Sequence, residues 1–293
     1  MSNKYIVKAT GEREEFNPQK LKNSLERAGA SPGSIEKIAE QIEGELEDGD
    51  TTKDIYTHAF ELLAKQEEKP AAVRYSLRRA IMDLGPTGFP FELFIAQVLQ
   101  TKGFETTTDF IAKGECAEHE IDITAWNKDK LIFIEAKFHN ELGLKSDLKA
   151  ALYVKARWDD LKEVEFRLSD ISPASPSDVW QGGAKKMDEG WLVTNTKFSE
   201  SAIKYAKCRD MKLIGWNYPE KGNLQDLIEE SGLHPITCLE SITPSDEKLL
   251  MEAGIVLCKQ AFDNRDIVAQ IGLSQEKISK MMEEINLIQA RRT

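Results

Sequence analysis

The first eighty residues contain a short strand-like stretch followed by apolar residues at helical spacing. Tyr5-Ile6-Val7-Lys8 has a strand pattern, Gly11 marks a turn, and Glu15-Phe16 forms the return. Asn17-Pro18 is typical of a helix N-cap followed by a proline in the first turn. The apolar repeats predict about four helices, which pass through or begin at Leu21, Ile38, Thr51-Thr52 and Pro70.

The segment Leu84-Gly85-Pro86-Thr87-Gly88 concentrates residues that break regular structure, so we expect a hinge there. Beyond it, one helical stripe ends at Gly103 and consists of Phe91, Phe94, Ile95, Val98 and Leu99. Strands are expected near 104–111, 119–126, 130–138, 191–194 and 211–216, with helices over about 146–163 and 199–208. The segment 164–187 is expected to be irregular. This order predicts an α/β sandwich with a central sheet.

From about Pro235 onward the pattern is helical throughout. Two similar segments, 249–255 and 268–273, each contain a glycine between apolar residues at a predicted turn between two helices. Such turns resemble helix-hairpin-helix elements, whose backbone amides contact DNA phosphates, and they are equally the ends of ordinary packed helices. We therefore expect three units: residues 1–85, 86–234 and 235–293.

The composition fits a folded protein without a membrane span, since 41% of the 293 residues are hydrophobic and no stretch approaches the ~20 apolar residues that cross a bilayer. The start lacks the apolar core of a signal peptide. The four cysteines include no Cys-x-x-Cys pair, which argues against a zinc ribbon or a disulfide framework. We expect a soluble protein of a reducing cytoplasm. The net charge of -11 argues mildly against a general nucleic-acid coat.

Candidate chemistry lies in two neighbouring strands. Alternate side chains of a strand share a face, so Glu135 and Lys137 point together while Ile134 and Ala136 enter the packing. In the preceding strand Asp122 is expected to point opposite to Ile121 and Ile123. If Asn127-Lys128-Asp129 closes a hairpin, the two carboxylates converge and suit a divalent metal, Mg²⁺ or Mn²⁺. Such an ion activates water and neutralises phosphate charge, while Lys137 orients that water or holds the phosphate.

A plainer interpretation of the same residues is a half-solvated strand. Two observations favour a site. The run 131–134 is apolar on both faces, which predicts a buried central strand whose terminal Glu and Lys need partners or a role. Glu92 lies at the edge of the preceding helical stripe and is placed to complete an acidic cluster. His139 either contacts the bound water or phosphate or lies in a solvated loop, and Lys155 and Arg157 are expected on a solvated helix face.

These motifs, taken together, resemble the PD-(D/E)xK nuclease superfamily, and its Mrr-type restriction branch most. The resemblance rests on Gly88-Phe89-Pro90-Phe91-Glu92, Glu120-Ile121-Asp122, Ile134-Glu135-Ala136-Lys137 and the closing phrase 190–198. It implies a restriction-endonuclease-like αβββαβ fold, with Asp122 and Glu135 as metal ligands, Lys137 as the water-orienting residue and Glu92 as an auxiliary acid. Many Mrr-type enzymes have Gln where Glu135 stands.

The first unit resembles the ATP-cone, a regulatory nucleotide-binding module. The resemblance follows Val7-Lys8, Gly11, 15–21, 51–55 and 73–79 in order and spacing. It implies a site for ATP or dATP that uses Val7, Lys8, Phe16, Lys20, Thr52 and Arg78. Cations and a helix N-terminus are suited to hold a triphosphate. The family usually has Lys-Arg-Asp/Asn-Gly where this chain has Lys8-Ala9-Thr10-Gly11, and a degenerate cone used only for packing or oligomerisation is the alternative.

The leading functional hypothesis is a Mg²⁺-dependent DNA endonuclease of the type IV restriction kind, modulated by ATP or dATP. Because double-strand cutting commonly needs two active sites, a dimer is expected. The second hypothesis is a nucleotide-responsive DNA-binding regulator without cleavage. A subunit of ribonucleotide reduction is the third, and the scattered cysteines argue against it.

Overall fold

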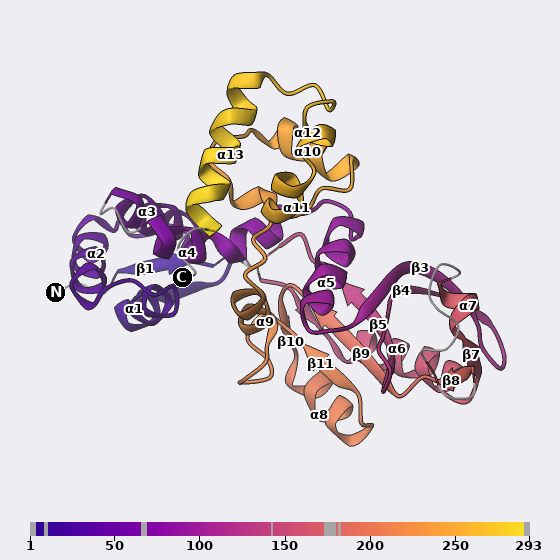
Figure 1. Ribbon diagram of the computed structural model, residues 1–293. Helices are drawn as coiled ribbons and strands as arrows, with labels where there is room; N and C mark the ends of the chain where they lie inside the picture. Colours follow the sequence, from indigo (N-terminus) through magenta and orange to yellow (C-terminus); the bar gives the residue numbers. More distant parts are fainter. Residues whose placement is uncertain are drawn as a thin grey trace.

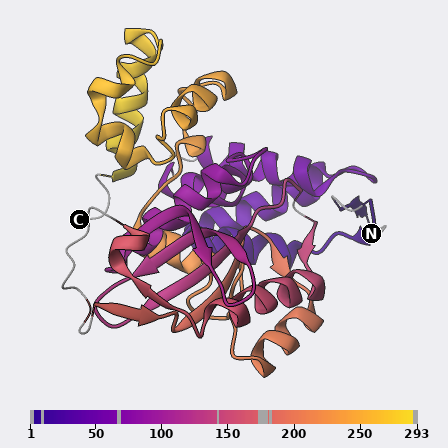
Figure 2. The same ribbon diagram turned by 90° about the vertical axis from the view of Figure 1, so that its right-hand side faces the viewer.

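A computed structural model describes residues 4–8, 11–65, 69–141, 143–172, 180 and 183–289. Figure 1 shows the three units: an N-terminal helical unit, a central sheet with helices on both faces, and a C-terminal group of helices. The C-terminal unit stands above the sheet in both Figure 1 and Figure 2. None of the described helices is long and apolar enough to cross a membrane.

The N-terminal unit is a two-stranded hairpin followed by four helices, as the sequence pattern predicts. Its elements are β1 (Tyr5–Val7), β2 (Arg13–Glu15), α1 (Pro18–Arg27), α2 (Pro32–Glu45), α3 (Thr52–Lys65) and α4 (Lys69–Met82). The Asn17 side chain accepts a hydrogen bond from the Gln19 amide and caps α1. Thr51 accepts the Asp54 amide and caps α3 in the same way. The unit has its own apolar core, centred on Leu25, Ile38 and Leu63.

The central unit contains a five-stranded mixed sheet in the order β11-β9-β5-β4-β3. Pairs β3–β4 and β4–β5 are antiparallel, whereas β5–β9 and β9–β11 are parallel. The strands are β3 (Glu105–Lys113), β4 (Glu118–Trp126), β5 (Leu131–Lys137), β9 (Glu189–Thr194) and β11 (Lys212–Ile214). Along the chain, the five strands and the helices between them occur in the predicted succession, and together they form a mixed α/β unit.

Helices cover both faces of this sheet and create two cores. One face packs against α5 (Phe89–Thr101) and α9 (Leu224–Ser231), and the other packs against α6 (Leu148–Leu161) and α8 (Glu200–Cys208). Strand β5 contributes Ile132 and Ile134 to the first core and Leu131 and Phe133 to the second. All four side chains are fully buried, as expected for a central strand.

The region 164–187 is more regular than predicted. Strands β7 (Glu165–Arg167) and β8 (Ala184–Lys186) pair antiparallel, and α7 (Leu168–Ile171) follows β7. A second small pair, β6 (Lys145–Ser146) with β10 (Lys197–Phe198), is parallel. Such short strands lack a periodic pattern, which is why the sequence does not reveal them. The predicted irregular stretch at 173–179 and 181–182 lies outside the described residues, as do Ala9 and Thr10.

The C-terminal unit is helical, as predicted. It consists of a 3-10 turn, η1 (Ile236–Cys238), and the helices α10 (Pro244–Glu252), α11 (Cys258–Asp263), α12 (Arg265–Val268) and α13 (Gln275–Gln289). Gly254 and Gly272 both have positive φ, the conformation that glycine adopts beyond a helix end. Contact of these turns with DNA stays a prediction.

Helix α4 contributes to three of the four cores, one in each unit. Ala71, Ala72 and Tyr75 pack in the N-terminal core, Leu77 and Ile81 pack in the core beneath α5, and Ala80 packs with the C-terminal helices. The Thr237 hydroxyl donates to the Ala80 carbonyl at 2.6 Å. The predicted hinge follows immediately, at Gly85 and Pro86. A shift of α4 would therefore change the packing of all three units, because close-packed interiors transmit strain.

Candidate functional site

The sheet opens locally between β4 and β5. Backbone pairing runs from Trp126 and Leu131 to Ile123 and Ile134 and stops there. At the next position the Asp122 carboxylate accepts the Ala136 amide at 2.7 Å, in place of a backbone carbonyl. The predicted hairpin at Asn127 is confirmed.

The expected alternation in β4 is wrong at this point. Ile121 packs on the α6 side of the sheet, whereas Ile123 packs under α5, so they do not share a face opposite Asp122. On the other side of β4, pairing with β3 skips the position where Asp109 and Asp122 face each other, and Asp109 has a φ of 56°. Non-glycine residues rarely adopt this conformation, and it commonly marks a bulge or a functional position.

In β5 the expected alternation holds for the packed residues. Ile134 and Ala136 lie in the core under α5. Glu135 points to the other face, where its carboxylate Oε2 accepts from Nη1 of Arg157 on α6. Lys137 is exposed at the end of the strand, and its carbonyl accepts the Thr194 hydroxyl at 2.8 Å.

Glu92 joins this group from the first turn of α5. Partial burial, and then the carboxylates of Asp122, Asp109 and Glu135, raise the pKa of Glu92 to about 7. Burial and the neighbouring Asp122 raise the pKa of Glu135 to about 7 as well, against the opposing effect of Arg157 and Lys137. Burial also raises the pKa of Asp122, opposed by the Ala136 amide. Glu92 therefore lies close enough to Asp122 and Glu135 for their charges to raise its pKa.

The described residues do not contain a ready-made set of three or more His, Cys, Asp or Glu side chains at metal-ligand geometry. In the acidic site, one Glu135 oxygen is engaged by Arg157, and one Asp122 oxygen by the Ala136 amide. What the site does show is an excess of carboxylate over nearby cationic charge.

The interpretation of α6 as solvated at Lys155 and Arg157 is wrong, because both side chains are buried. Lys155 pairs with Asp159 at 2.5 Å and lies over the Trp158 ring. Arg157 lies beside the apolar stripe of Val154, Trp158 and Leu161. This helical spacing is the signal that marks Arg157 as inward-facing in the sequence. Residue Ser146, placed on the helix by the prediction, instead ends β6 before Asp147 caps α6.

His139 is held by a buried polar network. Its Nε2 lies 3.0 Å from the Ser146 hydroxyl, which donates to Thr194 at 3.2 Å. Asn195 holds the His139 backbone with two bonds of 2.8 Å and also reaches the Met82 sulfur of α4 at 3.1 Å. Burial, and then Lys137, lower the pKa of His139, so its ring is neutral at pH 7. The network links the end of β5 to α4.

The predicted nucleotide contacts divide into two groups. Lys8 and Lys20 converge on one carboxylate, Glu14, at 2.9 and 3.2 Å. Residue Thr52 begins α3 beside Val7, which bridges to Thr51, and Phe16 packs at the edge of the same core. Arg78 is directed elsewhere, since its guanidinium lies over the Trp216 ring of the central unit at 5.8 Å.

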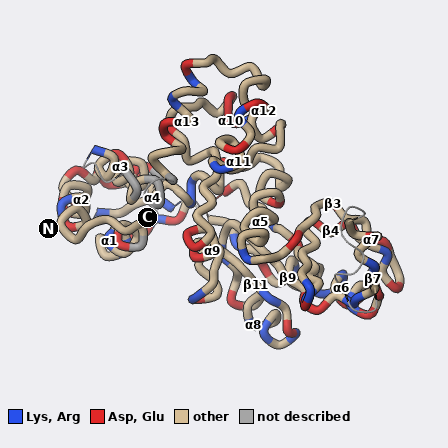
Figure 3. Tube along the Cα trace, viewed as in Figure 1, with Lys and Arg blue, Asp and Glu red and all other residues tan. Residues whose placement is uncertain are grey.

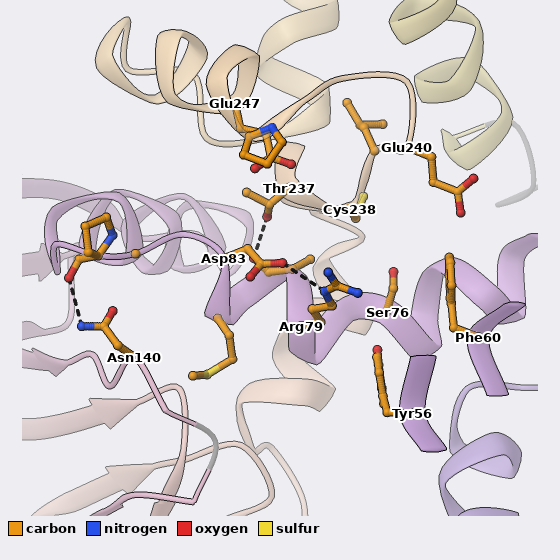
Figure 4. Close-up of a pocket in the computed structure, with 16 residues that line it drawn as sticks. Tyr56, Phe60, Ser76, Arg79, Asp83, Asn140, Thr237, Cys238, Glu240 and Glu247 are labelled. Atoms are coloured by element: carbon orange, nitrogen blue, oxygen red, sulfur yellow. Dashed lines mark hydrogen bonds and ion pairs between the residues drawn. The ribbon is translucent and has the colours of Figure 1, made fainter. Parts of the chain in front are cut away.

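A cavity of about 610 Å³ lies where the three units meet (Figure 4). Helices α3 and α4 form one wall with Tyr56, Phe60 and Arg79, and the C-terminal unit forms another with Thr237 and Glu247. Burial and then Asp83 raise the pKa of Glu247 to about 7. The Asn140 amide donates to the Pro86 carbonyl at this junction, so the residues after α4 contact the segment that follows β5.

Comparison with known proteins identifies an ATP-cone and an AF1548-like C-terminal module in this chain. The ATP cone domain model matches residues 4–84, and the model "AF1548-like, C-terminal" matches residues 234–289. An uncharacterized protein of Archaeoglobus fulgidus is 37% identical over 191 residues, which are 65% of this chain and 97% of that protein.

The solved structure of the protein of unknown function AF1548 is 35% identical. It covers 69% of this chain and 98% of its own, with a TM-score of 0.54. The chain belongs to the AF1548-like family. The ATP-cone indicates regulation by a bound nucleotide.

Proposed function

We propose that this protein is a Mg²⁺-dependent DNA endonuclease of the PD-(D/E)xK type, and that ATP or dATP bound to its ATP-cone modulates cleavage. The opening of the β4–β5 ladder carries the proposal, because it leaves Asp122 and Glu135 adjacent, with Lys137 two residues beyond. With the short elements β6, β7, α7 and β8 left aside, the order α5, β3, β4, β5, α6, β9 supports the αβββαβ arrangement of that superfamily.

The residues fit a hard divalent cation. Burial first, and then neighbouring carboxylates, raise the pKa values of Glu92 and Glu135, and burial raises that of Asp122; a cation bound here would offset these effects. Carboxylate oxygens are the ligands that Mg²⁺ prefers, and Mn²⁺ accepts the same donors. Asp122 and Glu135 would hold the ion. When bound, it would lower the pKa of a coordinated water and neutralise charge on the phosphate.

The side chains around this position suit the remaining steps of hydrolysis. A water oxygen bonds to phosphorus, the bond from phosphorus to the leaving sugar oxygen breaks, and that oxygen takes a proton from solvent, while the proton of the attacking water must be accepted. Glu92, with a pKa of about 7, is suited to accept that proton near neutral pH. Lys137, as an exposed point charge, is suited to hold the scissile phosphate or to orient the water.

Helix α4 supplies a physical route for regulation. It packs in the core of the ATP-cone, and its end contacts Asn195 through Met82. Asn195 in turn fixes the backbone of His139, two residues after Lys137. A nucleotide that changes the packing of the cone would shift the equilibrium position of α4 and, with it, the end of β5.

Cutting both strands of a duplex would require two such sites, so we propose a dimer. Acidic and basic residues are interspersed over all three units (Figure 3). The positive potential for DNA would therefore have to come from local groups such as Lys137 together with the bound cation.

The test is incubation of the purified protein with supercoiled plasmid and Mg²⁺, with and without ATP or dATP, beside Lys137→Ala and Asp122→Ala. The proposal predicts nicked and linear products that both variants lose. A nucleotide-dependent gel shift without scission would favour the alternative, a DNA-binding regulator. Equal cleavage by wild type and variants would assign the activity to a contaminant.

A further inference from the structure

Arg157 is the one side chain of α6 that reaches across to both strands at the opening of the sheet, among the described contacts. Its Nη1 donates to the Glu135 carboxylate, and its Nη2 donates to the Glu120 carbonyl. Residue Glu120 belongs to β4 and Glu135 to β5, at the level where the β4–β5 backbone ladder has stopped. The guanidinium therefore bridges the two strands where backbone hydrogen bonds do not.

The surroundings of Arg157 hold its guanidinium in one orientation. The group lies 5.4 Å from the Phe133 ring centroid and 5.3 Å from that of Tyr153, and only 8% of the residue is exposed. Tyr153 itself is 59% exposed, whereas Phe133 is fully buried, so one of the two rings beside the guanidinium reaches solvent. The nearby aromatic rings and the two hydrogen bonds of the planar guanidinium restrict the rotation of this group. A lysine ammonium would not be restricted in the same way.

We propose that Arg157 is a positioning residue: it fixes the Glu135 carboxylate and the Glu120 carbonyl at the opening, and so sets the geometry in which Asp122 and Glu135 receive a divalent cation. This inference rests on the proposed function for the identity of the cation site. The positioning itself rests on the two hydrogen bonds of the fork. Removal of a group that hydrogen-bonds to a metal ligand without touching the metal commonly lowers metal affinity or activity 10- to 100-fold.

The neighbouring cation Lys155 provides a matched control. It is buried on the same helix, but it pairs with Asp159, one turn away on α6. Loss of Lys155 removes one buried positive charge and leaves the β4–β5 bridge intact. A general effect of charge on the site would appear in both variants, whereas an effect of positioning appears only when Arg157 changes.

The experiment measures Mn²⁺ affinity by calorimetry and plasmid cleavage with the full chain and its Arg157→Ala, Arg157→Lys and Lys155→Ala variants. We expect Arg157→Ala to lose about 10- to 100-fold in Mn²⁺ affinity and in kcat, with KM for DNA changed less than about threefold. Arg157→Lys should lose most of the same amount, because one ammonium cannot make both bonds at once. Guanidinium ion at millimolar concentration should restore part of the Arg157→Ala activity, and Lys155→Ala should resemble wild type.

Wild-type Mn²⁺ affinity in Arg157→Ala, or an equal loss in Lys155→Ala, would overturn the inference and leave the proposed function standing. Mn²⁺ binding without cleavage in the wild type would refute the proposed function, and the affinities of the variants would still test positioning. No Mn²⁺ binding by the wild type would overturn both. If Arg157→Ala does not fold, Arg157→Lys decides, since wild-type affinity in that variant contradicts the need for the fork.

Discussion

Replacement of Glu92 by Gln tests the excess negative charge at the site directly. Partial burial and the carboxylates around Glu92, Asp122 first, raise its pKa from 4.5 to about 7. A folded-state pKa above the unfolded value means that the folded protein binds this proton more tightly. The metal-free wild type therefore loses stability as pH rises from about 4.5 to about 7, because the ionised Glu92 is disfavoured only in the folded state. Gln has nearly the same shape and does not titrate.

The magnitude follows from the pKa difference. About 2.5 pH units at about 1.4 kcal/mol each gives an upper value of about 3.5 kcal/mol. Because the side chain is only partly buried, solvent screening reduces this to about 1–2 kcal/mol. Above pH 8, the free energy of unfolding of metal-free Glu92→Gln should therefore exceed that of wild type by about 1–2 kcal/mol. At pH 5 this stability gap should be less than half as large.

Tryptophan fluorescence during urea unfolding in EDTA is the suitable assay. All five tryptophans lie between residues 126 and 216, so the signal reports the α/β unit alone. Glu118→Gln, which removes an exposed carboxylate of β4 in the same unit, is the control and should not reproduce the stability gap between Glu92→Gln and wild type. Mg²⁺ should narrow the gap, because the ion compensates the same charge. A gap that is the same at pH 5 and pH 8.5, or a variant less stable than wild type at pH 8.5, would refute the reasoning.

Four further predictions concern core packing, helix propensity, coupling between the units and nucleotide binding. Gly190→Ala should cost the α/β unit about 1–3 kcal/mol in urea unfolding, since a Cβ there lies 2.5 Å from the buried Trp158 ring. Gly33→Ala should raise the free energy of unfolding by about 0.5–1 kcal/mol in thermal unfolding, because a Cβ at this position of helix α2 meets open space. A variant less stable than wild type would contradict the open space described around Gly33. Asn195→Ala should reduce the effect of ATP on cleavage by roughly 2- to 30-fold, and an unchanged effect would exclude the route through α4. Lys20→Ala should weaken ATP binding about tenfold when measured by calorimetry. An affinity equal to that of wild type would show that Lys20 does not contact the nucleotide.

The longer helices and strands could be predicted from the sequence alone. Strong periodicity predicted the helices from Asn17 onward, the stripe of α5 and the buried strand β5, because burial of one helix face or of a whole strand leaves a local pattern. The short pairs β6–β10 and β7–β8 leave no such pattern, since two or three residues cannot show a period. Their existence depends on partners that are distant along the chain.

The candidate site was predictable in its residue types and only partly in its geometry. Spacing placed Glu135 and Lys137 on one strand, and the structure brings Glu92 and Asp122 beside Glu135. Strict alternation failed at Asp122, because the strand changes faces where its side chain replaces a backbone carbonyl. Arg157 was assigned to solvent because a charged residue is usually exposed. Its partners, Glu120 and Glu135, lie 37 and 22 residues away and cannot be paired with it from local sequence.

Cleavage of plasmid DNA by wild type and by Asp122→Ala, in the same preparation series with Mg²⁺ and ATP, tests the central claim most directly. We predict that wild type converts supercoiled plasmid to nicked and linear forms, that EDTA abolishes this, and that Asp122→Ala reduces the rate at least about 100-fold while keeping its fluorescence unfolding curve. Wild-type protein that binds ATP yet leaves the plasmid intact under every nucleotide condition, or an Asp122→Ala variant that cuts as fast as wild type, would contradict the assignment of a metal-dependent nuclease.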